Sequence, residues 1–129
     1  MRTSTKFASL LVLFTSFASA QQSTFDGKWS GPATSPSAGQ IQVNLTIAKG
    51  SGTMRYAQKV NYTTVDQCAN RDIPVSVVSQ TASEMVIAIQ GAKVLKGCID
   101  ETATLKLVDG KTLQSTLKDG RAMTLARSK

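Results

Sequence analysis

The amino-acid sequence predicts an all-β protein, a small antiparallel up-and-down β-barrel or a two-sheet sandwich of about eight strands with one disulfide. Three observations lead to this fold class. Apolar and polar residues alternate over several short segments, which is the period of a half-buried strand. Turns that contain glycine separate these segments at short intervals. After the first twenty residues, no stretch carries the helical period of apolar residues.

The first twenty residues have the layout of a secretory signal peptide that is cleaved after Ala20. Arg2 and Lys6 precede an apolar core, and small residues, Ala18-Ser19-Ala20, stand at the cleavage site. An apolar core of about ten residues is too short for a transmembrane helix, which needs roughly 20. We therefore expect an exported protein, periplasmic or secreted, with no membrane span. Residues 21–129 form its single all-β domain.

The first two predicted strands cover residues 27–33 and 40–48, and residues 30–39 (SGPATSPSAG) are expected to form most of the loop between them. In QIQVNLTIA the apolar residues occupy alternate positions and the polar residues occupy the others, as in an antiparallel strand with one buried face. The turn KGSG follows, and a third strand is predicted over 53–62. The alternate positions that are expected to face the interior of this strand hold Met54, Tyr56, Val60 and Tyr62.

The middle of the chain predicts strands over 73–78 and 84–90. Pro74 has the opposite parity to Ile73 and Val75, which places it at an edge or a strand start. The segments 63–72 and 91–100 are longer connections, and each carries one cysteine.

The last third predicts a three-stranded meander over 102–108, 111–117 and 121–127. Two Asp-Gly turns, which end at Gly110 and Gly120, separate these strands. Three-residue loops, Val108-Asp109-Gly110 and Lys118-Asp119-Gly120, keep the leucines on one face, with each glycine in the left-handed position. The expected pairs are Leu107–Lys111, Leu105–Leu113, Leu117–Arg121, Ser115–Met123 and Leu113–Leu125.

Cys68 and Cys98 are expected to form a disulfide, because an even pair of cysteines in an exported chain is typically oxidised. The chain has no histidine, which excludes a Ser-His-Asp or Cys-His pair and removes the usual zinc ligand. In a strand the neighbours Asp100 and Glu101 would point to opposite faces and would not converge as a glycosidase pair, so we interpret them as part of a solvated loop. We expect no catalytic residue, no metal and no cofactor.

The stretch Gly27-Lys28-Trp29-Ser30 near the mature N-terminus resembles the opening of the calycin barrels, which include lipocalins, fatty-acid-binding proteins and avidins. The avidin version is the most similar. In lipocalins this tryptophan closes one end of the barrel beneath an arginine from the last strand, so the resemblance implies a structural role for Gly27 and Arg127. In an even-stranded barrel the first and last strands are antiparallel, which brings Trp29 near Arg127 for a cation–π contact. Biotin sites of avidins use several tryptophans, and this chain has one.

Two functions are expected from these features. The first is a non-enzymatic barrel that binds a small apolar or amphipathic ligand through Trp29, Tyr56 and Tyr62. The alternative is a protein–protein interaction module, such as an inhibitor or an envelope-associated factor, that acts through the two cysteine-containing connections.

The formal charge of +7 falls to +5 without Arg2 and Lys6, and basic residues are scattered, so no specific nucleic-acid partner is expected. Asn44 and Asn61 begin glycosylation sequons that matter only in a eukaryotic source.

Overall fold

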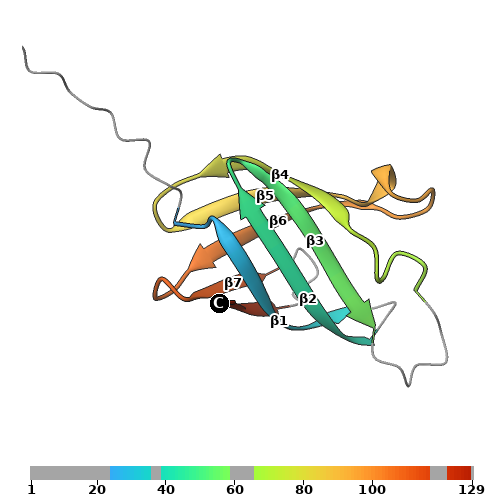
Figure 1. The fold of residues 1–129 in the computed structure, drawn as a ribbon, viewed down its shortest axis with the longest axis horizontal. Coiled ribbons are helices and arrows are strands. Elements are labelled where there is room, and N and C mark those ends of the chain that lie inside the picture. The colour runs from blue at the N-terminus through green and yellow to red at the C-terminus, as the bar shows by residue number, and fades with distance from the viewer. Residues whose placement is uncertain (1–23, 36–38, 59–65, 117–121, 129) are drawn as a thin grey trace, which may run out of the picture.

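Eight antiparallel strands, each paired with the next along the chain, close into one up-and-down barrel (Figure 1). The structure is a computed structural model that describes residues 24–35, 39–58, 66–116 and 122–128. The strands are β1 (Gly27–Ser35), β2 (Gly39–Ala48), β3 (Ser51–Gln58), β4 (Ile73–Gln80), β5 (Glu84–Gln90), β6 (Asp100–Leu107), β7 (Thr112–Thr116) and β8 (Ala122–Arg127). No helix in these ranges is long and apolar enough to cross a membrane.

The first and last strands decide between the barrel and the sandwich that the sequence left open. β1 pairs with β2 along its whole length, and its other edge pairs with β8 at Trp29↔Arg127 and Ser30↔Ala126. The backbone of β8 comes so close to Gly31 that a Cβ there would collide with the carbonyl oxygen of Thr124. The sheet therefore closes on itself, and the all-β barrel prediction is confirmed.

The prediction of a loop over residues 30–39 is wrong, because β1 continues to Ser35 and β2 already begins at Gly39. Pro32 lies inside β1, beyond the two residues that pair with β8 in the described part of the chain. Proline is tolerated where a strand needs hydrogen-bonded neighbours on one side only. Pro74, by contrast, is the second residue of β4, at the strand start that its parity predicted.

The barrel interior is filled by the apolar residues of the alternating pattern. In β2 every second residue is buried and the intervening residues are more exposed, so the period of two predicted the inward face correctly. The buried cluster comprises Phe25, Trp29, Ile41, Val43, Leu45, Ile47, Ile73, Val75, Met85, Ile87, Ile89, Ala103, Leu105, Leu113, Met123 and Leu125. An eight-stranded barrel has an interior just wide enough for side chains to fill, or to hold one small ligand.

The register of the two C-terminal hairpins was predicted correctly for one and incorrectly for the other. Ser115↔Met123 and Leu113↔Leu125 are present as expected, whereas the predicted Leu117–Arg121 pair and Gly120 lie outside the described residues. In the first hairpin Leu107 pairs with Leu113 rather than with Lys111, and Leu105 pairs with Ser115 rather than with Leu113.

The three-residue loop of that first hairpin is Asp109-Gly110-Lys111, since the Val108 amide donates to the carbonyl of Thr112. The error is a slip of two residues, which keeps every leucine on the buried face because the side-chain period is also two. Gly110 has a φ of +77°, the left-handed conformation that its place in the turn requires.

Ser115 is the buried polar residue inside this apolar barrel. Its side chain is 3% exposed, and its register partners on either side, Leu105 and Met123, belong to the core. The hydroxyl has no hydrogen-bond partner among the described residues. A buried hydroxyl without a partner has lost its hydration without compensation, so it lowers stability.

Ser115→Ala is therefore expected to raise the free energy of unfolding by about 1 kcal/mol. Urea denaturation followed by circular dichroism measures the change. Ser30→Ala is the matched control, because the Ser30 hydroxyl lies on the exposed side, 3.1 Å from the Ser128 hydroxyl. The control should shift the free energy by less than about 0.5 kcal/mol. A clear loss of stability in Ser115→Ala would show that this hydroxyl has a bonding partner.

Candidate functional site

One end of the barrel, which we call the closed end, is built around the only tryptophan of the chain. Trp29 is 1% exposed at the start of β1, and its indole Nε1 donates a hydrogen bond of 2.9 Å to the carbonyl of Phe25. The guanidinium carbon of Arg127 lies 4.1 Å from the centroid of the indole ring, within the range of a cation–π contact. The expected neighbourhood of Trp29 and Arg127 is therefore present.

Arg127 also holds the segment that precedes β1 across this end. Its Nη1 donates to the carbonyl of Asp26 at 2.8 Å, and its Nη2 donates to that of Thr24 at 2.6 Å. Gly27 has a φ of +133°, and a Cβ at this position would lie 2.8 Å from Nη1 of Arg127. Glycine is thus needed here for the backbone conformation, and a Cβ would in addition push Nη1 of Arg127 aside.

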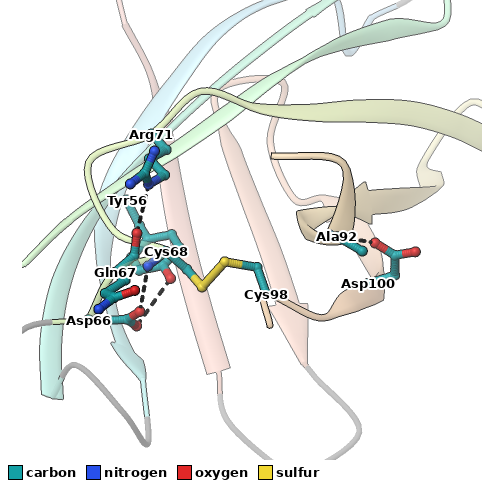
Figure 2. The surroundings of a disulfide bond; sticks show 8 residues. All are labelled: Tyr56, Asp66, Gln67, Cys68, Arg71, Ala92, Cys98 and Asp100. Carbon is teal, nitrogen blue, oxygen red and sulfur yellow. Dashed lines mark hydrogen bonds between the residues drawn. A yellow bond between two sulfur atoms is a disulfide. The ribbon is translucent and has the colours of Figure 1, made fainter. Parts of the chain in front are cut away.

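The opposite end, which we call the disulfide end, carries the link between Cys68 and Cys98. Their Cα atoms are 5.9 Å apart, and the predicted disulfide is confirmed. Cys68 lies in the connection between β3 and β4, and Cys98 lies after the short 3-10 helix η1 (Gly91–Lys93) that follows β5. Ala92 of η1 donates its amide to Asp100 Oδ1 at 3.0 Å, which fixes this second connection against the start of β6 (Figure 2).

Tyr56 is the aromatic residue of the disulfide end. It is half-buried on the inward parity of β3, paired with Val43 of β2. Its hydroxyl donates a hydrogen bond of 3.1 Å to Asp66 Oδ2 (Figure 2). The other carboxylate oxygen of Asp66 accepts the amide of Cys68 at 2.9 Å, and the amide of Asp66 donates to Gln58 Oε1 at 3.0 Å. One carboxylate therefore joins the barrel wall to the disulfide.

The electrostatic surroundings keep this phenol protonated. Burial raises the pKa of Tyr56 well above its ordinary value of about 10. The negative charge of Asp66, its hydrogen bond to the hydroxyl and the charge of Glu101 raise the pKa further. Glu101 is half-buried on β6, opposite Ile89 of β5. Asp66 is thus the carboxylate in contact with this half-buried hydroxyl, and the charge of Glu101 adds a smaller effect.

This raised pKa predicts a loss of stability at high pH. Above about pH 10 the unfolded chain releases the tyrosine proton while the folded protein keeps it, so the free energy of unfolding falls as pH rises. Tyr56→Phe should show a smaller fall than the wild type between about pH 9 and pH 11, measured by urea denaturation. Equal falls in the two proteins would mean that Tyr56 titrates normally when folded.

The candidate ligand residues from the sequence have different surroundings in the structure. Trp29 packs beneath Arg127 at the closed end, whereas Tyr56 is bonded to Asp66 near the disulfide. Tyr62 lies outside the described residues. Sequence reasoning missed Asp66 and the inward position of Glu101. The alternation of residues along β6 could have placed Glu101 on the inward face. No local pattern shows which side chain the Asp66 carboxylate contacts.

The described residues contain no group of three or more His, Cys, Asp or Glu side chains placed to hold a metal ion. An exposed ion pair, with Arg55 Nη1 3.3 Å from Asp72 Oδ1, lies on the outer side of the wall. Such a pair contributes little to stability. Comparison with protein-family models, with curated proteins and with solved structures finds no match to this chain.

Proposed function

We propose that this protein is a non-enzymatic binding module whose barrel takes a small amphipathic molecule at the disulfide end. The proposal rests on one observation, the half-buried Tyr56 on the inner face of the barrel, whose hydroxyl bonds the carboxylate of Asp66. Binding sites of this kind combine apolar lining with a few placed polar groups that orient the ligand. The likeness of Gly27-Lys28-Trp29 to the calycin barrels favours the same interpretation.

The exposure of the inner face supports this choice of end. Along β2, Val43 is 1% exposed and Ile41, nearer the disulfide end, is 8% exposed. The inner residues of β5 and β8 show the same increase, from Ile87 to Ile89 and from Leu125 to Met123. These inner faces are thus least exposed in the middle of the barrel and slightly more exposed toward the disulfide end. A ligand entering there meets apolar side chains first and the Tyr56 hydroxyl beside them.

The chemistry of these groups favours a ligand with an apolar body and a hydrogen-bond donor, an amine above all. The carboxylates of Asp66 and Glu101 accept hydrogen bonds, and an aromatic ring beside them suits a cation. A carboxylic acid would face like charge at the same place. We therefore expect medium-chain amines to bind more tightly than alcohols, and alcohols more tightly than fatty acids of equal length.

Titration with the neutral fluorophore Nile red, followed by competition with decylamine, decanol and decanoate, tests the proposal. Asp66→Asn should weaken decylamine about tenfold or more, since a hydrogen bond to a charged group contributes about 1.5–3 kcal/mol. Asp72→Asn is the matched control, because this carboxylate lies nearby but pairs with Arg55 in solvent. Absence of saturable Nile red binding, or equal effects of the two variants, would contradict the proposal.

A second candidate function, the protein–protein module, is favoured by Ile99. This side chain is 69% exposed and stands next to Cys98 in the connection that the disulfide fixes. An exposed apolar side chain on a loop that a disulfide holds in place is available for contact with a partner protein. Ile99→Asp should abolish co-purification of a specific partner from the native compartment and leave Nile red binding unchanged. Variants of the neighbouring Arg71 and Lys96 should weaken the same complex.

A further inference from the structure

The wall of the barrel is incomplete between β3 and β4 at the disulfide end. In the described residues β4 pairs with Ser51–Met54, the first half of β3, and the register ends at Met54↔Ile73. β3 itself continues to Gln58 and keeps its partner in β2 as far as Ile41↔Gln58. Residues 55–58 therefore have a neighbouring strand on one side only. Unpaired backbone groups along such an edge need other partners.

The segment 66–72, which we call the latch segment, supplies those partners. The amide of Asn70 donates to the carbonyl of Tyr56 at 2.7 Å, in the place where a strand would bond. The Asp66 amide and carboxylate bond the side chains of Gln58 and Tyr56. Ala69, within the segment, is buried. The latch segment thus closes the gap in the wall beside Tyr56 without being a strand.

The latch segment continues directly into β4 at Ile73, and the disulfide adds a covalent bond from it to a second connection. On the outer side of the wall its Asp72 also pairs with Arg55 of β3. Cys68 stands in the middle of the segment, and Cys98 belongs to the connection on the far side of the β4–β5 pair (Figure 2). Two of its remaining contacts are internal: Arg71 Nε donates to the carbonyl of Gln67, and the Ala69 amide donates to that of Asp66. A few hydrogen bonds to a loop offset only part of the entropy of ordering it, so the disulfide is needed to hold it closed.

We propose that the latch segment is a gate over the binding site, closed while the disulfide is intact and opened by reduction. This inference rests on the proposed ligand site, because the gate covers the edge of the wall at Tyr56. A dithiol reductant opens it in two steps. One thiolate of the dithiol attacks a sulfur of the Cys68–Cys98 bond and forms a mixed disulfide, releasing the other cysteine as a thiol. The second thiol of the reductant then displaces the remaining cysteine and leaves as the oxidised cyclic disulfide.

Hydrogen exchange of the full chain, resolved by residue with NMR, tests the gate without any ligand. On addition of dithiothreitol the Asn70 amide should exchange about tenfold faster or more, as expected for local opening. The Val77 amide, which donates to the Gly50 carbonyl at 2.9 Å, is the control: global unfolding exposes it, so it should stay much better protected than Asn70 even in the less stable reduced protein. The variant Cys68→Ser/Cys98→Ser should show the fast Asn70 exchange with no reductant, and reoxidation of the wild type should restore slow exchange.

Two results would overturn the gate. An unchanged Asn70 rate would show that the segment stays closed without its disulfide. Equal protection of Val77 and Asn70 in the reduced protein would show that the whole barrel opens as one unit. Nile red binding to the oxidised and the reduced protein distinguishes this inference from the proposed function. Faster binding to the reduced protein supports both the ligand site and its gate. Local opening without any Nile red binding to either form refutes the ligand site and, with it, a gate for that site.

Discussion

Trp29→Ala is expected to lower the free energy of unfolding by about 3–5 kcal/mol, the usual loss for a large aromatic side chain removed from a core. The indole is fully buried at the closed end and contributes packing, the hydrogen bond to the Phe25 carbonyl and the ring beneath Arg127. Removing it leaves a void that the barrel wall cannot fill, because the surrounding strands are fixed by their ladders. Urea denaturation followed by circular dichroism measures the loss.

The control for this variant is Val108→Ala, which truncates a large apolar side chain that is exposed in the β6–β7 turn. It should change the free energy by less than about 0.5 kcal/mol. A double-mutant cycle with Arg127→Leu isolates the cation–π pair, with an expected coupling of about 0.5–2 kcal/mol. A loss below about 1 kcal/mol in Trp29→Ala would contradict a structural role of the indole.

Loss of the disulfide, in Cys68→Ser/Cys98→Ser, is expected to lower the free energy of unfolding by about 3–4 kcal/mol. The two cysteines are 30 residues apart, and the bond removes the entropy of that loop from the unfolded chain. In this account the loss comes from the unfolded state, so the far-ultraviolet spectrum of the folded barrel should stay that of a β-sheet. Urea denaturation measures the difference between oxidised wild type and variant.

The wild type in dithiothreitol is the matched control, because it keeps both sulfur atoms and lacks only the bond. Its denaturation midpoint should agree with that of the double variant. A variant as stable as the oxidised wild type would show that the bond imposes no constraint on the unfolded chain. The exchange experiment on Asn70 measures a different property, namely local opening within the folded barrel.

The strand pattern was predictable because it depends on neighbours along the chain. Alternation in QIQVNLTIA fixed which side chains of β2 face inward, and β5 has the bounds that the sequence predicts, 84–90. The leucines of β6, β7 and β8 were placed on the correct face even where the register was wrong by two. A side chain's face depends on parity alone, whereas register depends on which turn closes at the lowest energy.

The candidate site was predictable only in part. Tyr56 was identified from its parity, but Asp66 acquires its role through contacts with Tyr56 and Gln58, which lie across a chain reversal. No local pattern predicts such a contact. The end of the β3–β4 ladder at Met54 was also unpredictable, because β3 continues to Gln58 whereas β4 begins only at Ile73, opposite Met54. This offset is what gives the latch segment a gap to close.

The sequence by itself determined that the chain forms strands, which of their side chains face inward, and that its two cysteines pair. The strands and their inward faces follow from the alternation of neighbouring residues. The pairing of the cysteines follows from their number and their chemistry. The tertiary structure alone decided that β1 pairs with β8, so that the sheet closes into a barrel and does not form a two-sheet sandwich. It also decided which end holds Trp29 beneath Arg127 and which holds Tyr56 against the carboxylate of Asp66. Closure depends on the accumulated tilt and stagger of all eight strands together, a property that no single segment carries.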